Sequence, residues 1–250
     1  MTEELKFLIE TVKEASKIIT EDFEVNAKGT KGDLVTNLDY EIEKFILKEI
    51  KNKYPNFDIV SEEFNSKKDL TENCFTVDPL DGTVNFANNI PLWGIQVACI
   101  KNAKTCAAVI YLPKLNELYY ADESGAYLND KKLVLNNNEN KNFMYAVEGV
   151  NRMPSLVRMS KYGGHPRIIG SACVDFAWVA SGRLDGIIFR YNTFWDYIPG
   201  TYIAKQAGAV VIDKYRAHIA SNSKELAEIL IKEARFFEGD NATSVEIPKD

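Results

Sequence analysis

The chain has 250 residues, of which 46% are hydrophobic and 26% charged, and its formal net charge is -6. This composition is typical of a globular protein that forms one large domain or two closely joined halves. The acidic balance and the lack of a dense Lys/Arg run argue against a nucleic-acid partner. No segment has the pattern of a signal peptide or the length of a membrane span, so no membrane partner is expected.

The cysteines and histidines argue against a zinc protein or a disulfide-stabilised one. The chain has four cysteines, and none of them forms a CxxC pair. Free thiols in a reducing compartment fit this usage best, and we therefore expect a cytoplasmic protein. The two histidines, His165 and His218, lie in unrelated sequence contexts, so a surface or structural role is the simplest interpretation of each.

The N-terminal half is predicted to combine two amphipathic helices with an antiparallel sheet. Apolar residues recur at helical spacing over residues 2–22 and from residue 34 to residue 54, on either side of a glycine-containing loop. Thr36 and Asp39 have the spacing of a capping box, which is the ordinary structural role of an aspartate at this place. Strand patterns follow at 57–60, 93–101, 104–113, 117–121, 125–128 and 132–135.

A polar, Asn-rich stretch at residues 136–142 separates this half from a second one, in which strands and helices alternate. We expect halves at 1–142 and 143–250, or one compact domain that contains both. The predicted strands are 144–150, 167–169, 185–189, 210–212 and 218–220, and the predicted helices are 155–161, 171–182, 195–207 and 223–235.

Residues 75–86, with the sequence FTVDPLDGTVNF, carry the strongest chemical signal. An apolar strand leads into two carboxylates, Asp78 and Asp81, and Pro79 is expected to end the strand at Asp78. A glycine then permits a sharp turn, and Thr83 is placed to cap a following helix. Carboxylates are ligands for hard divalent cations, and a helix N-terminus binds phosphate. The alternative is an ordinary β-turn, because Asp-Pro and Asp-Gly are common turn dipeptides.

The string resembles the metal-binding signature of the inositol monophosphatase family, the Mg²⁺-dependent, lithium-sensitive sugar-phosphate phosphatases. Three further segments agree in chain order: the K-x-x-x-x-D-L-V-T-x-x-D element from Lys28 to Asp39, the Glu-Glu pair that starts at Glu62, and the Trp-Asp pair that ends at Asp196. The resemblance covers residues 5 to 232, approximately. It implies an α/β (α+β) layered sandwich of alternating helix and sheet layers, the sugar-phosphatase fold.

The resemblance also implies a site with two or three Mg²⁺ ions. Glu62, Asp78 and the carbonyl oxygen of Leu80 would hold the first ion, and Glu62 would share a third through water. Asp78, Asp81 and Asp196 would hold the second. Because two metals acidify water and stabilise the entering and leaving oxygens of an in-line displacement, such a site needs no histidine base. Taken singly, each acidic residue has an ordinary alternative as a helix cap or a solvated surface group.

Further residues would bind the substrate or the attacking water. By resemblance, backbone N–H groups of Gly82 and Thr83 would bind the phosphate, with Asp81 and Asp196 beside it. Thr83 and Asp39, with Glu62, would position and activate the water. Ser171 and Ala172, near a predicted helix start, are candidate contacts for the leaving group.

Two departures from the family pattern affect the expected substrate. Inositol-preferring members carry a glutamate seven residues before the Trp-Asp aspartate, where this chain has Phe189 followed by Arg190. A phenylalanine cannot accept hydrogen bonds from a polyol, whereas Arg190 could meet a second phosphate. In the alternative interpretation, Phe189 belongs to the core and Arg190 to the surface. In addition, Ile198 and Pro199 replace small residues after Trp-Asp, and Pro199 is tolerable in a first helical turn.

We therefore expect Mg²⁺-dependent hydrolysis of a small phosphate monoester, a phosphorylated sugar, polyol or nucleotide, with inositol monophosphate as the default substrate. One alternative is a phosphatase for fructose 1,6-bisphosphate, a 3′-phosphonucleotide or NADP. A second is a non-enzymatic binding protein that keeps the fold, although all the ligand residues are present. The resemblance also implies a homodimer.

Overall fold

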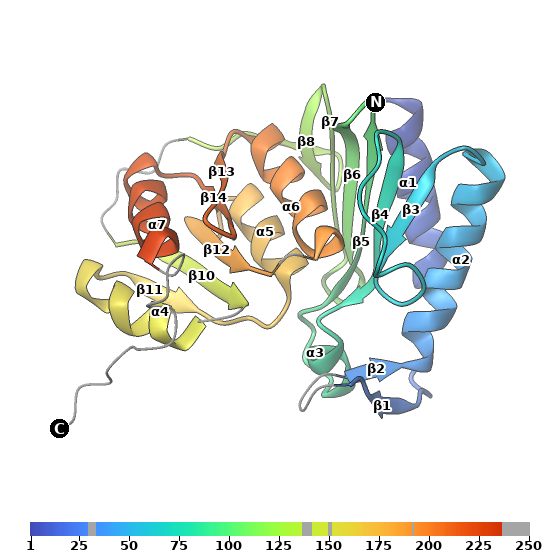
Figure 1. Cartoon of the computed structure of the whole chain (residues 1–250), viewed down its shortest axis with the longest axis horizontal. Helices are drawn as coiled ribbons and strands as arrows, with labels where there is room; N and C mark the ends of the chain where they lie inside the picture. The colour runs from blue at the N-terminus through green and yellow to red at the C-terminus, as the bar shows by residue number, and fades with distance from the viewer. Residues whose placement is uncertain (30–33, 137–141, 150–151, 192, 237–250) are drawn as a thin grey trace.

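Two β-sheets and three helix layers stack in the order helix, sheet, helix, sheet, helix (Figure 1). The computed structural model describes residues 1–29, 34–136, 142–149, 152–191 and 193–236. The expected layered sandwich is thus confirmed. The Asn-rich stretch and the C-terminal tail lie largely outside the described residues, and the division of the chain at residue 142 stays a prediction.

The first layer consists of α1 (Glu3–Ser16) and α2 (Asn37–Lys53), whose apolar faces pack on the larger sheet. The Thr2 side chain caps α1 by accepting a hydrogen bond from the Leu5 N–H at 3.2 Å. This helix is shorter than predicted, because the backbone N–H groups of residues 17–19 bond three rather than four residues back and so tighten the chain into turns.

A small antiparallel hairpin, β1 (Val25–Ala27) with β2 (Leu34–Thr36), precedes α2 and was not predicted. Residues 34–36 had been expected to open the helix. They are extended instead, and Thr36 is the N-cap of α2 in a capping box with Asp39. The predicted capping box is therefore confirmed. The helix itself starts after the β2 strand, at Asn37, and not at residue 34 as predicted.

The larger sheet has seven strands in the order β3-β4-β5-β6-β7-β8-β9. The β3 and β4 strands are parallel, and every other neighbouring pair is antiparallel, as the meander pattern predicted. Its strands are Asp58–Ser61, Cys74–Asp81, Gly94–Lys101, Lys104–Leu112, Glu117–Asp122, Gly125–Leu128 and Lys131–Leu133.

The prediction that Pro79 ends its strand was wrong. The β4 strand continues to Asp81, with a register shift between Asp78, which pairs with Gln96, and Asp81, which pairs with Gly94. Proline has no N–H for the ladder, and a local bulge absorbs this loss without ending the strand. The bulge places both carboxylates at the end of one strand.

The middle layer consists of α5 (Ala172–Ala180) and α6 (Phe194–Ala207), which pack between the two sheets. The helices approach closely at Gly200, where an added Cβ would lie 2.4 Å from the Cβ of Phe176. Pro199 lies inside α6 and not in its first turn, which corrects the sequence-based placement. Nearly every face of these helices is apolar, as is typical of helices covered on both sides.

The second sheet has the order β11-β10-β12-β14-β13 and is mixed. Its outer face is covered by α4 (Arg152–Met159) and α7 (Lys224–Phe236). The strand predicted at 167–169 lies two residues earlier in the structure. The β11 strand is His165–Arg167, and these three residues pair with β10. Its strands are Met144–Gly149, His165–Arg167, Gly186–Arg190, Val210–Lys214 and Ala217–Ser221.

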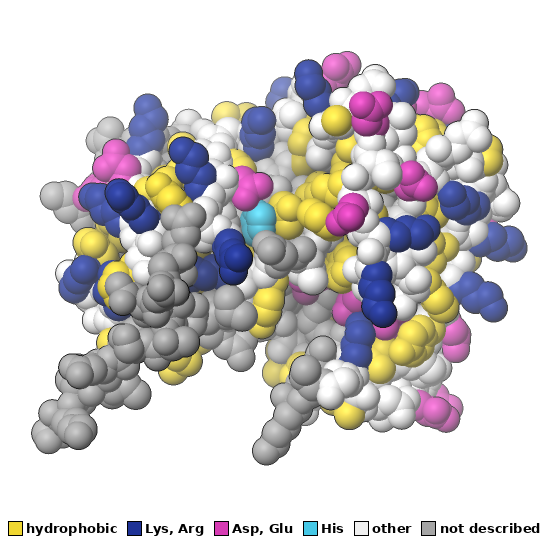
Figure 2. Space-filling model, viewed as in Figure 1, with side chains coloured by type: hydrophobic (Ala, Val, Ile, Leu, Met, Phe, Trp, Pro, Cys, Tyr) yellow, Lys and Arg dark blue, Asp and Glu magenta, His cyan; other side chains and the backbone are white. Residues whose placement is uncertain are grey.

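All four cysteines are free thiols, as predicted. None of the described helices combines the length with the apolar composition that a membrane span requires. On the face drawn in Figure 2, Lys and Arg side chains are spread over both halves and do not gather into one patch.

Candidate active site

Three carboxylates from two distant segments meet at the seam between the larger sheet and the middle helix layer. One carboxylate oxygen each of Asp78, Asp81 and Asp196 lies within 4.8 Å of the others. The first two come from the end of β4, and the third from the first turn of α6. Asp78 is buried, and the other two are half-buried. The structure therefore brings together the three residues that the sequence predicted for one metal position.

Asp78 is held at the β4 bulge by its own strand and by the next one. Its Oδ1 accepts a hydrogen bond from the Leu80 N–H at 3.1 Å, and its Oδ2 accepts one from the Gln96 amide at 3.3 Å. The same Gln96 amide donates to the backbone carbonyl of Asp196 at 3.4 Å. Gln96 is fully buried and thus ties β5 to the Asp78 carboxylate and to the backbone of Asp196.

Asp81 accepts its hydrogen bonds from the N-terminus of α5. The Ser171 hydroxyl donates to Asp81 Oδ2 at 2.7 Å, and the Cys173 N–H donates to the same oxygen at 2.6 Å. Ser171 is the N-cap residue of α5, but its side chain is used for Asp81 and not for its own helix. A helix N-terminus stabilises a negative charge, which suits an ionised carboxylate here.

Asp196 lies in the first turn of α6, where Thr193 is the N-cap residue. The Asp196 N–H donates to the Thr193 carbonyl at 3.0 Å, and the Thr193 hydroxyl donates to the Asp196 carboxylate. The ordinary interpretation of Asp196 as the cap itself is therefore wrong, and one carboxylate oxygen remains for the cluster. The position also benefits from the helix dipole.

Glu62 follows β3 directly and pairs with a lysine. Its carboxylate lies 2.7 Å from the Lys28 ammonium, which also contacts Glu63. The turn that carries both glutamates is fixed by Glu43 of α2, whose carboxylate accepts hydrogen bonds from the N–H of Glu63 at 2.8 Å and of Phe64 at 2.9 Å. The positive charge of Lys28 thus reduces the repulsion between the adjacent carboxylates of Glu62 and Glu63.

Asp39 and Thr83 contact each other between α2 and the turn after β4. The Thr83 hydroxyl lies 3.2 Å from Asp39 Oδ1 and 3.0 Å from the carbonyl oxygen of Leu80. The other oxygen of Asp39 accepts hydrogen bonds from the Thr36 N–H at 2.8 Å and from its hydroxyl at 2.5 Å. Burial raises the pKa of Asp39 to about 6. Asp39 therefore caps its helix and also contacts Thr83, and its role at the site stays a prediction.

Gly82 is the N-cap of a short helix, α3 (Thr83–Ala87), and has φ of 88°. An added Cβ there would lie 3.0 Å from the Cβ of Ser171 and 3.1 Å from the Leu92 carbonyl oxygen. Glycine is therefore needed for its backbone conformation and for the close approach of α5. Thr83 was expected as the cap and is instead the first helical residue.

The electrostatics of the cluster favour a bound cation. Burial raises the pKa of Asp78 and Asp196 well above the usual range, and repulsion by neighbouring carboxylates adds to this effect. Burial also raises the pKa of Asp81, although its hydrogen bonds from Ser171 and Cys173 oppose the shift. A divalent cation would remove this penalty. The donor set contains only oxygen atoms, which fits a hard ion such as Mg²⁺ or Ca²⁺ better than zinc or copper.

Phe189 and Arg190 point to opposite faces of the second sheet. Phe189 is 2% exposed and packs against Phe176 of α5, in the middle layer, and against His218 of the neighbouring strand β14. Arg190 is 3% exposed, and its guanidinium donates to the Ser155 hydroxyl of α4 at 2.7 Å. Phe189 is thus a core residue, as the alternative interpretation had it, and Arg190 is buried on the far side of the sheet.

The sequence did not identify Gln96, Glu43 or the hydrogen bond that Ser171 donates to Asp81. A glutamine in an apolar strand, and a glutamate on the buried face of α2, are polar residues at core positions of an otherwise clear pattern. Buried polar groups require partners, and such interruptions are a usable signal. A polar residue in an apolar pattern shows that the position is unusual, but the sequence does not show which residue it contacts.

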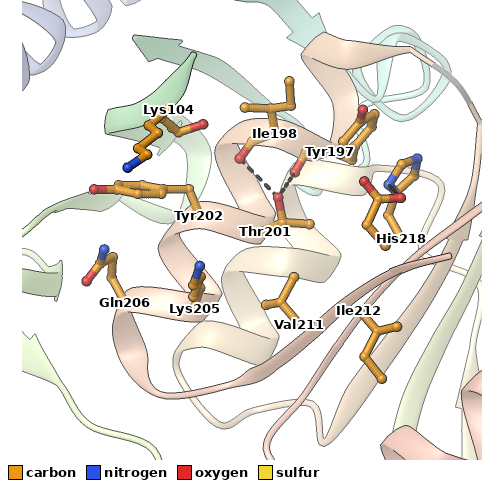
Figure 3. Close-up of a pocket in the computed structure, with 12 residues that line it drawn as sticks. Lys104, Tyr197, Ile198, Thr201, Tyr202, Lys205, Gln206, Val211, Ile212 and His218 are labelled. Atoms are coloured by element: carbon orange, nitrogen blue, oxygen red, sulfur yellow. Dashed lines mark hydrogen bonds and ion pairs between the residues drawn. The ribbon is translucent and has the colours of Figure 1, made fainter. Parts of the chain in front are cut away.

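A groove of about 480 Å³ is lined by residues of α6 together with residues of β6, β13 and β14. Figure 3 shows Lys104 and Tyr202 at one end and Tyr197 and His218 at the other, with Thr201 donating to two backbone carbonyls between them. None of the three clustered aspartates lines it. The groove and the candidate active site are therefore separate features that share one helix.

The sequence model described as the inositol monophosphatase family matches residues 1–237. The chain belongs to the inositol monophosphatase family. A Thermotoga maritima protein named fructose-1,6-bisphosphatase/inositol-1-monophosphatase is 34% identical over 186 residues, which are 72% of each chain. The family resemblance drawn from residues 75–86 is thus confirmed.

Solved structures of this family share the fold. That of a Thermotoga maritima inositol monophosphatase has a TM-score of 0.84 and 27% identity, and the match covers 95% of this chain and all of that one (100%). An inositol monophosphatase/NADP phosphatase complexed with Mg²⁺ and phosphate has a TM-score of 0.78 and 21% identity, with 91% and 92% covered. Membership places the chain among phosphatases of phosphate monoesters and confirms the predicted enzyme class.

Proposed function

We propose that the chain hydrolyses a small phosphate monoester in a Mg²⁺-dependent reaction, with inositol monophosphate as the first substrate to test. The observation that carries this proposal is the meeting of Asp78, Asp81 and Asp196 within 4.8 Å. The cluster adjoins the N-terminus of α5 and the turn into α3, whose backbone N–H groups can bind an anion. Acidic ligands and phosphate-binding amides side by side suit a bridging cation.

The residues fit two metal positions that share Asp78. Asp78, Asp81 and Asp196 would hold one ion, and Glu62, Asp78 and the Leu80 carbonyl oxygen the other, with a third, water-linked ion at Glu62. Bound ions of this kind acidify water and neutralise charge on a transferring phosphoryl group. Lys28 pairs with Glu62 and would limit repulsion among the carboxylates. The number of ions, two or three, is part of the proposal.

Thr83 and Asp39 are placed to handle the proton of the attacking water. The Thr83 hydroxyl donates toward Asp39, so its lone pairs can accept a hydrogen bond from water. A proton can then pass from the water to Thr83 and from Thr83 to Asp39. The pKa of Asp39, raised to about 6, suits a base that works near neutral pH.

The phosphate would lie against the N–H groups of Gly82 and Thr83, and the leaving group near Ser171 and Ala172. Ser171 lies close to Gly82 and contacts Asp81, which supports this orientation. Arg190 is directed toward Ser155 and gives no support for a second phosphate. The names of two relatives, a fructose-1,6-bisphosphatase and an NADP phosphatase, keep bisphosphates and NADP as a second candidate. Lithium inhibition and a homodimer remain expectations from the family.

The test is phosphate release from a panel of monoesters during a Mg²⁺ titration, with Asp81→Asn as the diagnostic variant. Asparagine can still accept the hydrogen bonds of Ser171 and Cys173, but it removes a ligand charge, so kcat is expected to fall by at least about 100-fold with an unchanged circular dichroism spectrum. The double variant Lys104→Ala/Lys205→Ala, in the groove on α6, is the control and should retain full activity. Near-normal turnover of Asp81→Asn would refute the assignment.

A further inference from the structure

Glu148 lies at the end of β10, beside Phe189 of β12. The two strands are parallel, and Glu148 and Phe189 are paired in register. Paired residues in a sheet point to the same face, and Phe189 faces the middle helix layer together with Ala146 and Ile187. The side chain of Glu148 is therefore directed toward α5 and the candidate active site.

The carboxylate of Glu148 contacts the residue that precedes Ser171, and Ser171 in turn contacts the acidic cluster. Its Oε2 accepts a hydrogen bond from the Gly170 N–H at 3.3 Å. The next residue, Ser171, donates to Asp81 at 2.7 Å. The backbone between Ile169 and Ser171 is itself fixed, because the Asn85 amide of α3 donates to the Ile169 carbonyl at 2.9 Å. Glu148 thus adjoins the segment where the leaving group is expected.

The alternation of side chains separates Glu148 from Arg190. In the same pair of strands, Gly149 pairs with Arg190, whose guanidinium points to Ser155 on the outer face. A shift of the register by one residue would exchange the two faces. The sheet therefore presents a carboxylate to the site and keeps the guanidinium away from it.

Asp175 is a second buried carboxylate near Glu148. It lies in α5, is fully buried, and neither of its carboxylate oxygens has a hydrogen-bond partner among the described residues. Burial and the nearby negative charges of Glu148 and Asp81 raise the pKa of Asp175 well above the usual range. The two carboxylates therefore lie close enough to interact electrostatically.

We propose that Glu148 selects the leaving group by accepting hydrogen bonds from its hydroxyls, an inference that rests on the proposed phosphatase activity. An ionised carboxylate accepts hydrogen bonds and donates none, and in a 6% exposed position it is poorly screened. It therefore favours a monophosphate of a polyol or sugar and disfavours a second phosphate at the same place, which it would repel. Phe189 supplies the apolar wall beside it.

The experiment compares Glu148→Gln with the unmodified chain on three substrates at saturating Mg²⁺: myo-inositol 1-phosphate, phenyl phosphate and fructose 1,6-bisphosphate. Glutamine keeps the shape and can still accept the Gly170 hydrogen bond. The kcat/KM for inositol 1-phosphate should fall by at least about tenfold, from the loss of a charged hydrogen bond. The kcat/KM for phenyl phosphate, whose leaving group has no further hydroxyls, should change less than about twofold. The ratio of the kcat/KM for fructose 1,6-bisphosphate to that for inositol 1-phosphate should rise.

The matched control is Glu233→Gln, a buried glutamate of α7 that pairs with Arg158 on the far side of the second sheet. It should lower thermal stability but affect all three substrates alike. If Glu148→Gln folds poorly, Glu148→Asp, which retracts the same charge by one methylene, should show the selective loss. Equal losses on inositol 1-phosphate and phenyl phosphate, or no loss on the former, would overturn the proposal. If the unmodified chain releases phosphate from no substrate, the proposed function itself fails, and this proposal with it.

Discussion

The hydroxyl of Ser171 donates a hydrogen bond of 2.7 Å to Asp81 across the seam between the two halves of the molecule. Ser171 occupies the N-cap position of α5, and Asp81 ends β4. The Cys173 N–H reaches the same carboxylate oxygen at 2.6 Å. Asp81, at the end of β4, is thus positioned by the N-terminus of α5, which lies about 90 residues later in the chain.

Replacing Ser171 with alanine should weaken the site without unfolding the chain. A hydrogen bond to a charged acceptor contributes about 1.5–3 kcal/mol, so we expect kcat/KM to fall by about tenfold or more and Mg²⁺ to bind less tightly. The matched control is Ser181→Ala at the other end of α5, where the hydroxyl donates to the Ala177 and Trp178 carbonyls of its own helix and also interacts with Tyr119. Steady-state kinetics and calorimetric Mg²⁺ titrations measure both effects. Equal behaviour of the two variants would contradict this role of Ser171.

Thr83 should matter through its hydroxyl. Thr83→Ala removes the group that lies 3.2 Å from Asp39 and is expected to lower kcat by about 100-fold, with a smaller effect on KM. Thr83→Ser keeps the hydroxyl and should recover most of the activity. Single-turnover kinetics distinguish a slower chemical step from slower product release. If serine recovers no more activity than alanine does, the hydroxyl is not the essential group.

The stability of the metal-free protein should depend on pH in an unusual direction. The pKa values of Asp78, Asp81 and Asp196 are raised by burial above the ordinary value, which is about 3.9. Between the ordinary and the raised values, the folded state binds more protons than the unfolded state, so stability falls as pH rises. In EDTA, the melting temperature should therefore increase when the pH is lowered from about 8 to about 6.

Mg²⁺ should reverse this trend, because it compensates the ionised carboxylates. The increase in melting temperature on adding Mg²⁺ should be larger at about pH 8 than at about pH 6. Asp78→Asn, which removes the most buried of the three charges, should flatten the pH dependence in EDTA. A melting temperature in EDTA that rises steadily with pH would contradict the interpretation.

Arg190 is expected to affect stability rather than substrate choice. Its guanidinium is 3% exposed and donates to Ser155, so Arg190→Ala leaves a cavity and an unpaired hydroxyl between β12 and α4. The free energy of unfolding should fall by about 2–4 kcal/mol, measured by urea denaturation. The ranking of monophosphate and bisphosphate substrates should not change. A specific loss of bisphosphate activity would instead favour the second candidate function.

Much of the fold followed from local patterns. The periodicity of α1 and α2, the meander of the larger sheet and the capping box at Thr36 were predictable, because each depends on residues a few positions apart. The errors occurred where a tertiary contact outweighs a local rule. Pro79 did not end β4, since a bulge absorbs it, and Pro199 lies within a helix that is packed on both sides.

The sequence by itself determined the family to which the chain belongs and named the acidic residues expected at the candidate site, because both depend on short sequence motifs. Only the tertiary structure decided that Ser171 and Gln96 bind carboxylates of the cluster, and that Glu148 rather than Arg190 is on the sheet face that packs against the middle helix layer. The physical reason is that a strand's register sets the face to which each side chain points. Register depends on contacts between segments that are distant in the chain, and no local pattern records them.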